Sequence, residues 1–533
     1  MSGIGTNRSA AGPTVDGADL RAVRDERYVL AVDFGTGGPK VGVVSLTGKV
    51  AHQVVHTVET TYLPGGGATQ DPVQWWDLVR TAATDVLDAS GIERGHVVAV
   101  SVTGQWASTV PVDEAGIPVG PVVMWMDSRG GPEVRRRVGG PVAGYKPRPI
   151  AEFIRRSGGA PSLDGADPIG HRLHLKTGEP AVWAAARWML EPVDYLSMCF
   201  TGRAVASPAS MTGSWLVDTR NPASTAYDPV LVALGGTGEE KLPPLVPFGS
   251  IIGTVREPVA NELGLGDDVV VVTGSPDLHT AALGTGAVGR GEANMAVSTT
   301  GWISLVTGRK KTDIIRQVAT VPGLDTSGYL VANNHETAGM CLAWLRGVLG
   351  GEPSFDELTD LAAGSEAGAG GVLFTPWLKG ERSPIADGRA RAGFHNLSLG
   401  TTRADLVRAV MEGVAYNNRW LHDAVERFVG GRLDNLRFFG GGAQSSLWCQ
   451  IHADVMDRTI EQVADPLYCG LRGAALLASR SLGAVDRSEL RSLVEVAQVY
   501  TPDPANRAVY DRLFAEFPGL YGAQKKMFHR LNG

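Results

Sequence analysis

Runs of apolar residues divide most of the chain into short strands and helices. Strands are expected at residues 28–33, 41–46, 97–102, 122–126, 302–306 and 436–439, which are short apolar runs with turn-forming residues at their ends. Helices are expected from residue 72 onward and at 181–190, 340–349, 403–428, 447–456 and 470–480. The clearest is 403–428, where apolar residues recur on one helical face. Because strands and helices mix in both halves, the pattern predicts an α/β protein.

The stretch at residues 269–301 (VVVVTGSPDLHTAALGTGAVGRGEANMAVSTTG) carries the first candidate chemistry. A buried-strand pattern breaks at residues 274–276, Asp277 opens a small-residue segment, and a second strand ends in a Ser/Thr/Gly turn. A carboxylate at a strand-to-helix break can meet a substrate from a rigid scaffold, and such a turn can hold phosphate. The stretch favours phosphoryl transfer with Asp277 as the proton acceptor, although an Asp at this place can also be a helix cap.

A second Gly/Thr turn lies near the start of the chain. Residues 28–33 end at Asp33, and FGTGGPK and another strand follow, which predicts a β-hairpin. Thr36 and Lys40 could donate to an anion, but the same string is also an ordinary hairpin turn. A strand follows the turn, so it is neither a Walker loop nor a Rossmann fingerprint. In an internal duplication the two turns would face each other across a cleft, with Asp33 on the wall opposite residues 269–301.

Two other segments bear on the site and its surroundings. Gln105 and Trp106 follow the strand at 97–102, and ligands commonly bind at the carboxyl ends of α/β strands. We expect Gln105 to hydrogen-bond a hydroxyl-rich ligand and Trp106 to stack on it. Residues 130–176 are rich in Gly, Pro and Arg without a clear period, so we expect an irregular excursion or cap there.

Bulk properties narrow the function classes. A chain of 533 residues predicts two or more domains, and a net charge of -7 gives no general reason to bind nucleic acid or an anionic membrane. Four scattered cysteines without a CxxC pair indicate neither a zinc site nor a disulfide framework, which fits the cytoplasm. No segment has the apolar run of a membrane helix. Residues 1–27 lack the apolar middle of a secretory signal and are expected to be a flexible extension.

Seven short motifs then follow one another in the sequence. They are Asp33-Phe34-Gly35-Thr36 with Lys40, Thr103-Gly104-Gln105, Trp125-x-Asp127-x-Arg129, Gly274-x-x-Asp277 with Gly284-Thr285-Gly286, Thr299-Thr300-Gly301, Gly380-Glu381-Arg382-Ser383-Pro384, and Gly440-Gly441-Gly442-Ala443 with Ser445, Trp448 and Gln450. In this order, across residues 28 to about 482, they resemble the motifs of the FGGY carbohydrate kinases. The family's C-terminal signature is also nearly complete over residues 392–412, with Asn396 where a glycine is usual.

The resemblance implies a two-lobed actin/hexokinase/Hsp70-like fold, a duplicated ribonuclease H-like architecture with an interdomain cleft. It places an N-terminal kinase domain at residues 28–288 and a C-terminal one at 289–533. The implied reaction is ATP-dependent phosphorylation of a hydroxyl of a small sugar or polyol, with Mg²⁺, and relatives are often homodimers. The implied roles are Asp277 as catalytic base; Gln105, Trp106, Asp127 and Asp277 at the acceptor; Thr36, Gly37, Lys40, Thr299, Thr300, Gly301, Gly339, Gly441, Gly442 and Ser445 at the nucleotide; and Asp33 at the metal.

The acceptor is less defined than the reaction. The closest resemblance is to xylulokinases, whose sugar loop usually reads G-Q-M-H-G and whose base is usually followed by Asn. Here Trp106 and Ala107 replace Met and His, and Leu278 follows Asp277. The sequence therefore leaves three acceptors open: a ketose such as xylulose, another ketose, or a polyol. Two functions of other classes stay open: an actin- or Hsp70-like ATPase switch, and a catalytically silent sugar-binding relative.

Overall fold

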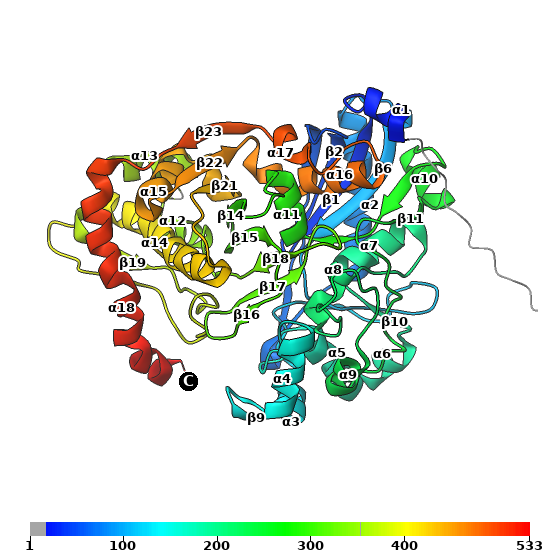
Figure 1. Cartoon of the computed structure of the whole chain (residues 1–533), viewed down its shortest axis with the longest axis horizontal. Helices are drawn as coiled ribbons and strands as arrows, with labels where there is room; N and C mark the ends of the chain where they lie inside the picture. The colour runs from blue at the N-terminus through cyan, green and yellow to red at the C-terminus, as the bar shows by residue number, and fades with distance from the viewer. Residues whose placement is uncertain (1–16, 352, 533) are drawn as a thin grey trace, which may run out of the picture.

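The computed structural model describes residues 17–351 and 353–532, which form two α/β lobes side by side (Figure 1). Residues 1–16 of the expected N-terminal extension lie outside the described residues. From residue 17 the chain differs from that expectation, because α1 (Gly17–Ala22) is docked on the protein. Leu20 is buried in the core, and Arg21 forms an ion pair with Asp486 at 2.8 Å. An apolar anchor and an ion pair thus hold the end of the extension.

The N-terminal lobe is built on a seven-stranded mixed sheet within the described residues. Its path runs β11-β12-β6-β1-β2-β3, and β13 also pairs with β6. The strands are β1 (Tyr28–Gly35), β2 (Gly38–Ser45), β3 (Val50–Val55), β6 (Val97–Gly104), β11 (Ile251–Thr254), β12 (Val270–Val272) and β13 (Ser275–Pro276). β1 pairs antiparallel with β2 and parallel with β6, and β12 pairs parallel with β6.

The C-terminal lobe repeats this arrangement in an eight-stranded sheet of the order β16-β17-β18-β15-β14-β21-β22-β23, again within the described residues. The strands are β14 (Ala293–Val297), β15 (Gly301–Thr307), β16 (Thr312–Asp313), β17 (Val318–Pro322), β18 (Tyr329–Ala332), β21 (Asn435–Phe439), β22 (Thr459–Val463) and β23 (Val496–Tyr500). β14 pairs antiparallel with β15 and parallel with β21, as β1 does with β2 and β6. The topology of the two lobes is therefore duplicated, as the two Gly/Thr turns predicted.

Helices and short strands complete each half. The first half has α2 (Pro72–Ala89), α3 (Gly131–Val138), α4 (Pro147–Arg156), α5 (Pro168–Gly178), α6 (Pro180–Ala185), α7 (Pro192–Thr201), α8 (Pro208–Met211), α9 (Pro229–Gly235), α10 (Glu257–Leu263) and α11 (Asp277–Thr285). The second half has α12 (Met340–Leu349), α13 (Phe355–Ala363), α14 (Arg403–Val429), α15 (Ser446–Met456), α16 (Cys469–Ser481), α17 (Leu490–Leu493) and α18 (Arg507–Leu531). The short strands are β4 (Thr61–Leu63), β5 (Gly67–Gln70), β7 (Val110–Val112), β8 (Val122–Val123), β9 (Gly139–Val142), β10 (Trp188–Leu190), β19 (Leu373–Thr375) and β20 (Gly393–His395).

Both faces of the N-terminal sheet are buried, which explains its continuous apolar strands. Successive residues of a strand point to opposite faces, so Leu30 and Val32 join the core under α2, while Val29 and Ala31 join a core shared with the other lobe. That shared core contains α11 and α16. Helix α16, from the C-terminal half, lies on β1, β2 and β6, and α11 packs on α16 and touches β14, β15 and β21. The two helices therefore connect the lobes (Figure 1).

Glycines let α11 and α16 approach closely. A Cβ built on Gly473 would lie 1.9 Å from the carbonyl oxygen of Thr280, and one on Gly284 would lie 2.0 Å from that of Cys469. Real Cβ atoms do not come that close to a carbonyl oxygen, so no other residue type fits at either position without separating the helices.

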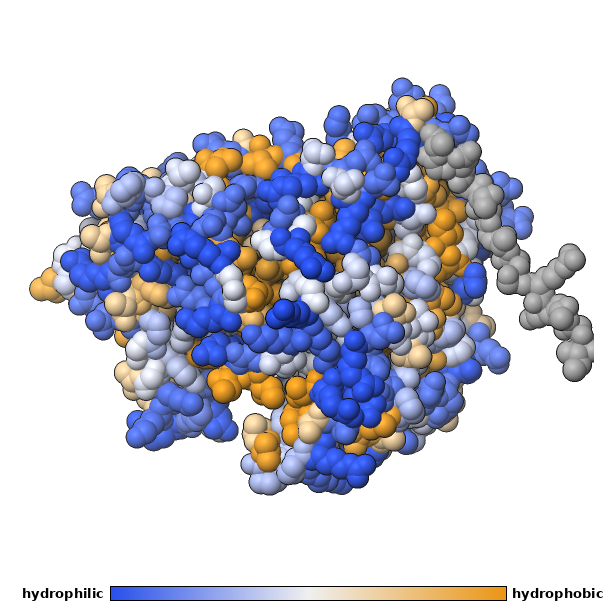
Figure 2. Space-filling model, in the orientation of Figure 1, coloured by the Kyte–Doolittle hydropathy of each residue, from blue (hydrophilic) through white to orange (hydrophobic). Residues whose placement is uncertain are grey.

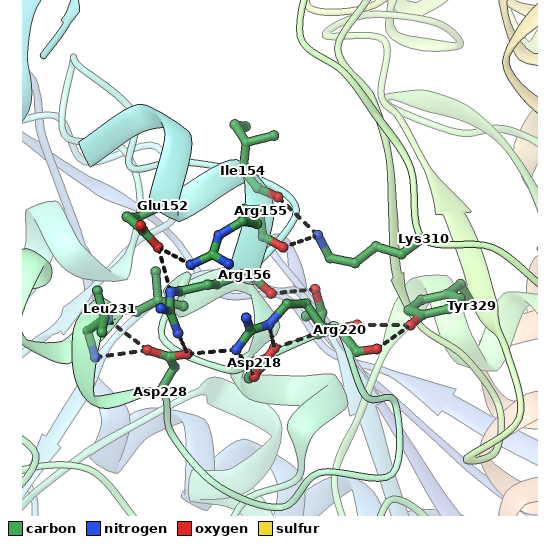
Figure 3. A network of polar contacts seen from close by, with 12 residues as sticks. Glu152, Ile154, Arg155, Arg156, Asp218, Arg220, Asp228, Leu231, Lys310 and Tyr329 are labelled. Atoms are coloured by element: carbon green, nitrogen blue, oxygen red, sulfur yellow. Dashed lines mark hydrogen bonds and ion pairs between the residues drawn. The ribbon is translucent and has the colours of Figure 1, made fainter. Parts of the chain in front are cut away.

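A second contact joins the lobes through α4 and the segment between β15 and β18. Lys310 donates from Nζ to the carbonyl oxygens of Ile154 and Arg155, at 2.9 and 3.0 Å, at the end of α4. Tyr329 donates from its hydroxyl to the carbonyl oxygen of Thr219 at 3.0 Å, and Thr312 donates to Gly158 at 2.6 Å. Figure 3 shows Lys310 and Tyr329 reaching across to the N-terminal lobe. Each donor belongs to the C-terminal lobe and each acceptor is a main-chain oxygen of the other.

Three expectations about elements were wrong. Residues 130–176 are not irregular, since they form α3, α4 and α5 with β9 between them. Residues 181–190 do not form one helix, because α6 ends at Ala185 and β10 follows. Asp33 does not face Asp277 from an opposite wall, although the end of the stretch at residues 269–301, β14 and the turn at 298–301, belongs to the C-terminal lobe. Strands β1 and β13 both pair with β6, so Asp33 and Asp277 belong to the same lobe.

The surface shown in Figure 2 is mostly hydrophilic, with apolar residues in small groups. Among the described helices, none is both long and apolar enough to cross a membrane. Cys199, Cys341, Cys449 and Cys469 are all buried and unpaired.

Candidate active site

Asp33 lies at the end of β1 with its carboxylate largely free. Its side chain is 17% exposed, Lys40 Nζ lies 3.9 Å from its Oδ2, and no residue in the described part of the chain donates a hydrogen bond to it. The backbone of Gly470 at the start of α16 lies close to it, since a Cβ built there would be 2.3 Å from Asp33 Oδ2. An ionised carboxylate with unused lone pairs is the kind of oxygen ligand that a hard cation binds.

Asp277 is the first residue of α11 and lies close enough to Asp33 for their charges to interact. It is partly accessible, yet burial and then the charge of Asp33 raise the pKa of Asp277 to about 7. Its Oδ1 accepts a hydrogen bond from the amide of Leu278 at 2.7 Å. A carboxyl group with this pKa can hold or accept a proton near neutral pH.

Two threonines fix the start of α11 against the end of β6. Thr103 donates from Oγ1 to the carbonyl oxygen of Ser275 at 2.9 Å and lies 2.7 Å from Thr280 Oγ1. Thr280 in turn donates to the carbonyl oxygen of Asp277 at 3.2 Å. Asp277 is therefore held relative to the loop that follows β6, where Gln105 and Trp106 lie.

Gln105 and Trp106 occupy that loop next to Asp277. The Nε2 of Gln105 is buried and has no hydrogen-bond partner among the described residues. Trp106 donates from Nε1 to the carbonyl oxygen of Ser210 at 2.6 Å, and its ring lies edge-on to His279 with centroids 6.4 Å apart. Its indole N–H is already used, so Trp106 can meet a ligand only through carbon atoms. Leu278 is 6% exposed and packs in the shared core rather than at the site.

Asp127 is placed differently from the other acceptor candidates. It is fully buried, and its Oδ2 accepts from the amide of Ala68 at 2.9 Å and from Arg129 Nε at 2.9 Å. Burial alone would raise the pKa of Asp127, but the hydrogen bonds of Arg129 and Ala68 hold it below its ordinary value. This carboxylate is occupied by protein groups.

The first Gly/Thr turn is open on one side and fixed on the other. No atom lies within 4 Å of a Cβ built on Gly37, so a ligand can approach the backbone there. Thr36 accepts from Trp125 Nε1 at its hydroxyl, at 3.0 Å, and from Gln70 Nε2 at its carbonyl oxygen, at 2.9 Å. The turn is thus held in place while its outer face stays accessible.

The second turn, Ser298 to Gly301, joins β14 to β15 in the C-terminal lobe, with Thr299 exposed and Thr300 partly exposed. The segment at 335–339 holds it through three backbone hydrogen bonds. Gly339, Ala338 and His335 donate to the carbonyl oxygens of Ser298, Thr299 and Gly301, at 2.6, 3.0 and 2.7 Å.

The glycines expected at the nucleotide have two different environments. A Cβ on Gly441 would meet nothing within 4 Å, whereas one on Gly339 would lie 2.6 Å from the oxygen of Ser298 and one on Gly442 would lie 2.6 Å from Val297. Gly441 therefore leaves space for a ligand, while Gly339 and Gly442 allow the backbone to pack against the second turn. Ser445 caps α15 by accepting from the amide of Trp448.

Several residues that shape the site were missed at the sequence level. Gln70 and Trp125 hold Thr36, and Glu191 accepts from the amide of Ala107 at 2.8 Å. Burial raises the pKa of Glu191 well above its ordinary value. Buried beside it is Arg172, whose pKa burial lowers to about 10 and which has no hydrogen-bond partner among the described residues at Nε or Nη2. Charged residues in apolar stretches are the signal that could have found this pair.

One backbone segment lies between the glycine loop at Gly440 and the carboxylate of Asp33. Gly440 donates from its amide to the carbonyl oxygen of Pro466 at 3.0 Å, and the chain continues from Pro466 to Gly470, which lies against Asp33. The structure therefore places Asp33, Lys40, Asp277, Gln105 and Trp106 in one lobe, and Thr299 to Gly301 with Gly441 in the other.

Known proteins resemble this chain in both lobes. Residues 28–284 match the N-terminal domain, and residues 295–482 the C-terminal domain, of the FGGY family of carbohydrate kinases. A xylulose kinase of Staphylococcus epidermidis is 28% identical over 94% of this chain and 98% of its own length. A glycerol kinase of Dechloromonas aromatica is 27% identical over 96% and 99%. The crystal structure of a xylulose kinase from Rhodospirillum rubrum superposes with a TM-score of 0.80 at 28% identity, covering 94% of this chain and 100% of that one. The two-lobed actin/hexokinase-like fold is thereby confirmed.

Proposed function

This chain belongs to the FGGY family of carbohydrate kinases and is an ATP-dependent carbohydrate kinase, and we propose that it phosphorylates a hydroxyl of a small ketose or polyol with Asp277 as the general base. The observation that carries the proposal is the pair of Asp277 and Asp33 beside the loop of Gln105 and Trp106. One carboxylate has a pKa of about 7, and the other has no hydrogen bond from a described residue. The first suits proton transfer and the second suits a cation.

In the proposed reaction the acceptor hydroxyl lies against Asp277. Its oxygen attacks the γ-phosphorus of ATP, the bond from that phosphorus to the β–γ bridging oxygen breaks, and ADP leaves with those electrons. The hydroxyl proton passes to Asp277, whose Oδ1 is held by the amide of Leu278. Thr103 and Thr280 keep the carboxylate in position, which supplies the alignment that phosphoryl transfer mainly needs.

The nucleotide phosphates would lie between the two turns. We assign Thr36, Gly37 and Lys40 to one side and Thr299, Thr300 and Gly301 to the other. Gly441 leaves room for the nucleoside, and Gly339, Gly442 and Ser445 support the backbone that surrounds it. Asp33 fits Mg²⁺, since its free carboxylate can take the ion directly or through water, and the ion would neutralise phosphate charge. Lys40, whose Nζ lies 3.9 Å from Asp33 Oδ2 and whose side chain is 38% exposed, would donate to a phosphate bound beside Asp33.

The acceptor contacts would be made by Gln105 through its unpartnered Nε2 and by Trp106 through its ring. Asp127 would support the site by holding Ala68 and Arg129 rather than by touching the acceptor. Ala107 and Leu278 offer no polar side chain where xylulokinases usually carry His and Asn. This composition supports a ketose other than xylulose, or a polyol. The buried, unpaired cysteines support a reducing compartment such as the cytoplasm.

The test is ADP production from ATP with a panel of pentuloses, hexuloses, tetritols, pentitols and glycerol. The proposal expects ADP release only with one acceptor class and no release by an Asp277→Asn variant with the same acceptor. ADP release that is equal with every acceptor and with none would instead show an ATPase switch. Acceptor binding in calorimetry without any ADP release would show a silent relative.

A further inference from the structure

Glu381 is a buried carboxylate that no arginine or lysine neutralises among the described residues. Its side chain is 0% exposed, and three N–H groups and a ring nitrogen of His335 surround it. Oε1 accepts from the amides of Glu336 and Arg382 at 3.0 and 2.8 Å, and Oε2 accepts from Asn417 Nδ2 at 2.6 Å and lies 3.1 Å from His335 Nδ1. These contacts use both oxygens of the Glu381 side chain and hold it on two sides.

The geometry also fixes how His335 is held. His335 Nδ1 lies 3.1 Å from Glu381 Oε2 and 3.0 Å from Asn417 Nδ2, so it donates to Glu381 in one tautomer and accepts from Asn417 in the other. The other ring nitrogen, Nε2, is buried and has no partner among the described residues. The ring is therefore held by polar contacts only at Nδ1. Its opposite edge lies beside the second turn, because a Cβ built on Gly301 would be 3.6 Å from His335 Cδ2.

The same segment carries the second turn. His335, Ala338 and Gly339 donate the three backbone hydrogen bonds that hold the turn from Ser298 to Gly301. Glu381 fastens the beginning of that segment twice, at the His335 ring and at the Glu336 amide. The contacts thus run in one direction, from Glu381 through residues 335–339 to the turn that we assign to phosphate.

We propose that Glu381 is a positioning residue for the ATP phosphates, acting through His335 and the Glu336 amide on the turn from Ser298 to Gly301. This inference rests on the proposed function, in which that turn binds phosphate. It gives the buried Glu of the Gly380-to-Pro384 motif a task in the reaction, although the residue touches neither ATP nor the acceptor. The adenine and ribose contacts and the acceptor site would be independent of it.

A purely structural role predicts something different. If Glu381 only stabilised the lobe, its loss would lower the melting temperature and weaken every ligand alike. If Glu381 positions the turn, its loss should lower the affinity of a ligand only as far as that ligand places phosphate groups on the turn. ATP and ADP should lose affinity, whereas adenosine and the acceptor should bind as before, because only the phosphates meet the turn.

The experiment compares Glu381→Gln with Glu336→Gln in the full chain. Glu381→Gln keeps the shape and replaces one acceptor oxygen of the carboxyl group by an NH₂ group that cannot accept from the surrounding N–H groups. Glu336→Gln is the matched control, because that carboxylate joins the same two loops through Arg382 Nε at 2.9 Å but is 19% exposed and pairs with an exposed arginine. Calorimetry measures ATP, ADP and adenosine binding, and kinetics measures KM for ATP and for the best acceptor found in the panel. We expect Glu381→Gln to weaken ATP by about 10- to 100-fold, the worth of a charge-assisted hydrogen bond, with adenosine and acceptor within about 2-fold of wild type.

A second pair of variants keeps the test decisive if Glu381→Gln does not fold. His335→Asn retains a donor near the position of Nδ1 and should stay close to wild type, whereas His335→Leu removes it and should reproduce the selective loss of ATP. Equal weakening of ATP and adenosine in the variants, or no change in either, overturns the inference. The failure of the proposed function looks different, since the wild type would then transfer no phosphate to any acceptor while the binding comparison could still be made.

Discussion

Replacing Asp277 by Asn should remove the reaction and at the same time stabilise the protein at neutral pH. The amide cannot accept the hydroxyl proton, so turnover should fall by orders of magnitude while nucleotide binding changes little. The gain in stability has a separate cause. Asp277 ionises as the pH rises through about 7, in a place where burial and the charge of Asp33 disfavour its ionised form.

The size of the gain follows from the pKa. The pKa of Asp277 is raised from 3.8 to about 7. Each pKa unit corresponds to about 1.36 kcal/mol, so the ionised carboxylate lowers the free energy of unfolding by up to about 4 kcal/mol. The folded pKa of this acid lies above the unfolded one. The contribution of Asp277 to stability is therefore complete below about pH 4 and is lost as pH rises through about 7. Asn does not titrate, so the advantage of the variant should be near zero at low pH and reach its maximum above pH 7.

Melting temperature measured against pH for both proteins, without nucleotide or Mg²⁺, tests this directly. In a lobe of this size, a gain of a few kcal/mol in the free energy of unfolding raises the melting temperature by roughly 4 to 15 °C. We expect this difference between the variant and the wild type at pH values above 7. Other groups titrate in both proteins and largely cancel in the difference. A variant that was less stable than wild type at pH 8, or a difference that did not grow between pH 4 and 7, would refute the assigned environment of Asp277. Residual turnover near the wild-type rate would refute its role as base.

Four other changes have defined outcomes. Acceptor kcat/KM in the wild type should fall about tenfold per pH unit below about 7, and a flat profile there would contradict the pKa of the base. Gly473→Ala should destabilise the protein by about 1–3 kcal/mol or more in denaturant unfolding, whereas Gly522→Ala, which meets no atom within 4 Å, should not. Trp106→Ala should change the acceptor profile in the panel, and an unchanged profile would remove Trp106 from the site. Lys310→Met should separate the lobes in small-angle scattering and raise acceptor KM several-fold, unless its bonds to α4 contribute nothing to their contact.

The sequence predicted best those helices that have both a periodic apolar face and a recognisable capping residue at the N-terminus. Helix α14 has an apolar face and a capping box at Thr402 and Asp405, and α2 begins after the capping Asp71. Helices α3, α4 and α5 were missed because residues 130–176 are rich in Gly, Pro and Arg and show no clear period. Each of these helices has a proline at its first or second position, as at Pro147 and Pro168. Proline is favourable at the first helical position, so its presence there does not argue against a helix.

The residues of the site, too, include some that the sequence could nominate and some whose role only the structure shows. Sequence motifs could nominate Asp33, Asp277 and the two Gly/Thr turns, because these residues carry their chemistry in the side chain or in a local backbone shape. The sequence could not show which of these residues lie next to each other in space. That Asp33 and Asp277 flank β6 in one lobe follows from strand order, and the occupied carboxylate of Asp127 follows from contacts 59 residues apart along the chain. A buried glutamate such as Glu381 looks like any motif residue until the groups around its carboxylate are seen.

Gly470 brings the C-terminal half of the chain to the carboxylate of Asp33. Helix α16 joins the lobes through its close approach to α11, and its second residue lies against the carboxylate of Asp33. The segment before it is bonded to Gly440, which is next to the place that we propose for the nucleoside. Because Gly470 has no side chain, the backbone of α16 itself lies against Asp33 Oδ2. Residues 466–470 therefore border both the carboxylate that we propose for Mg²⁺ and the loop that we propose for the nucleoside, although these two places belong to different lobes.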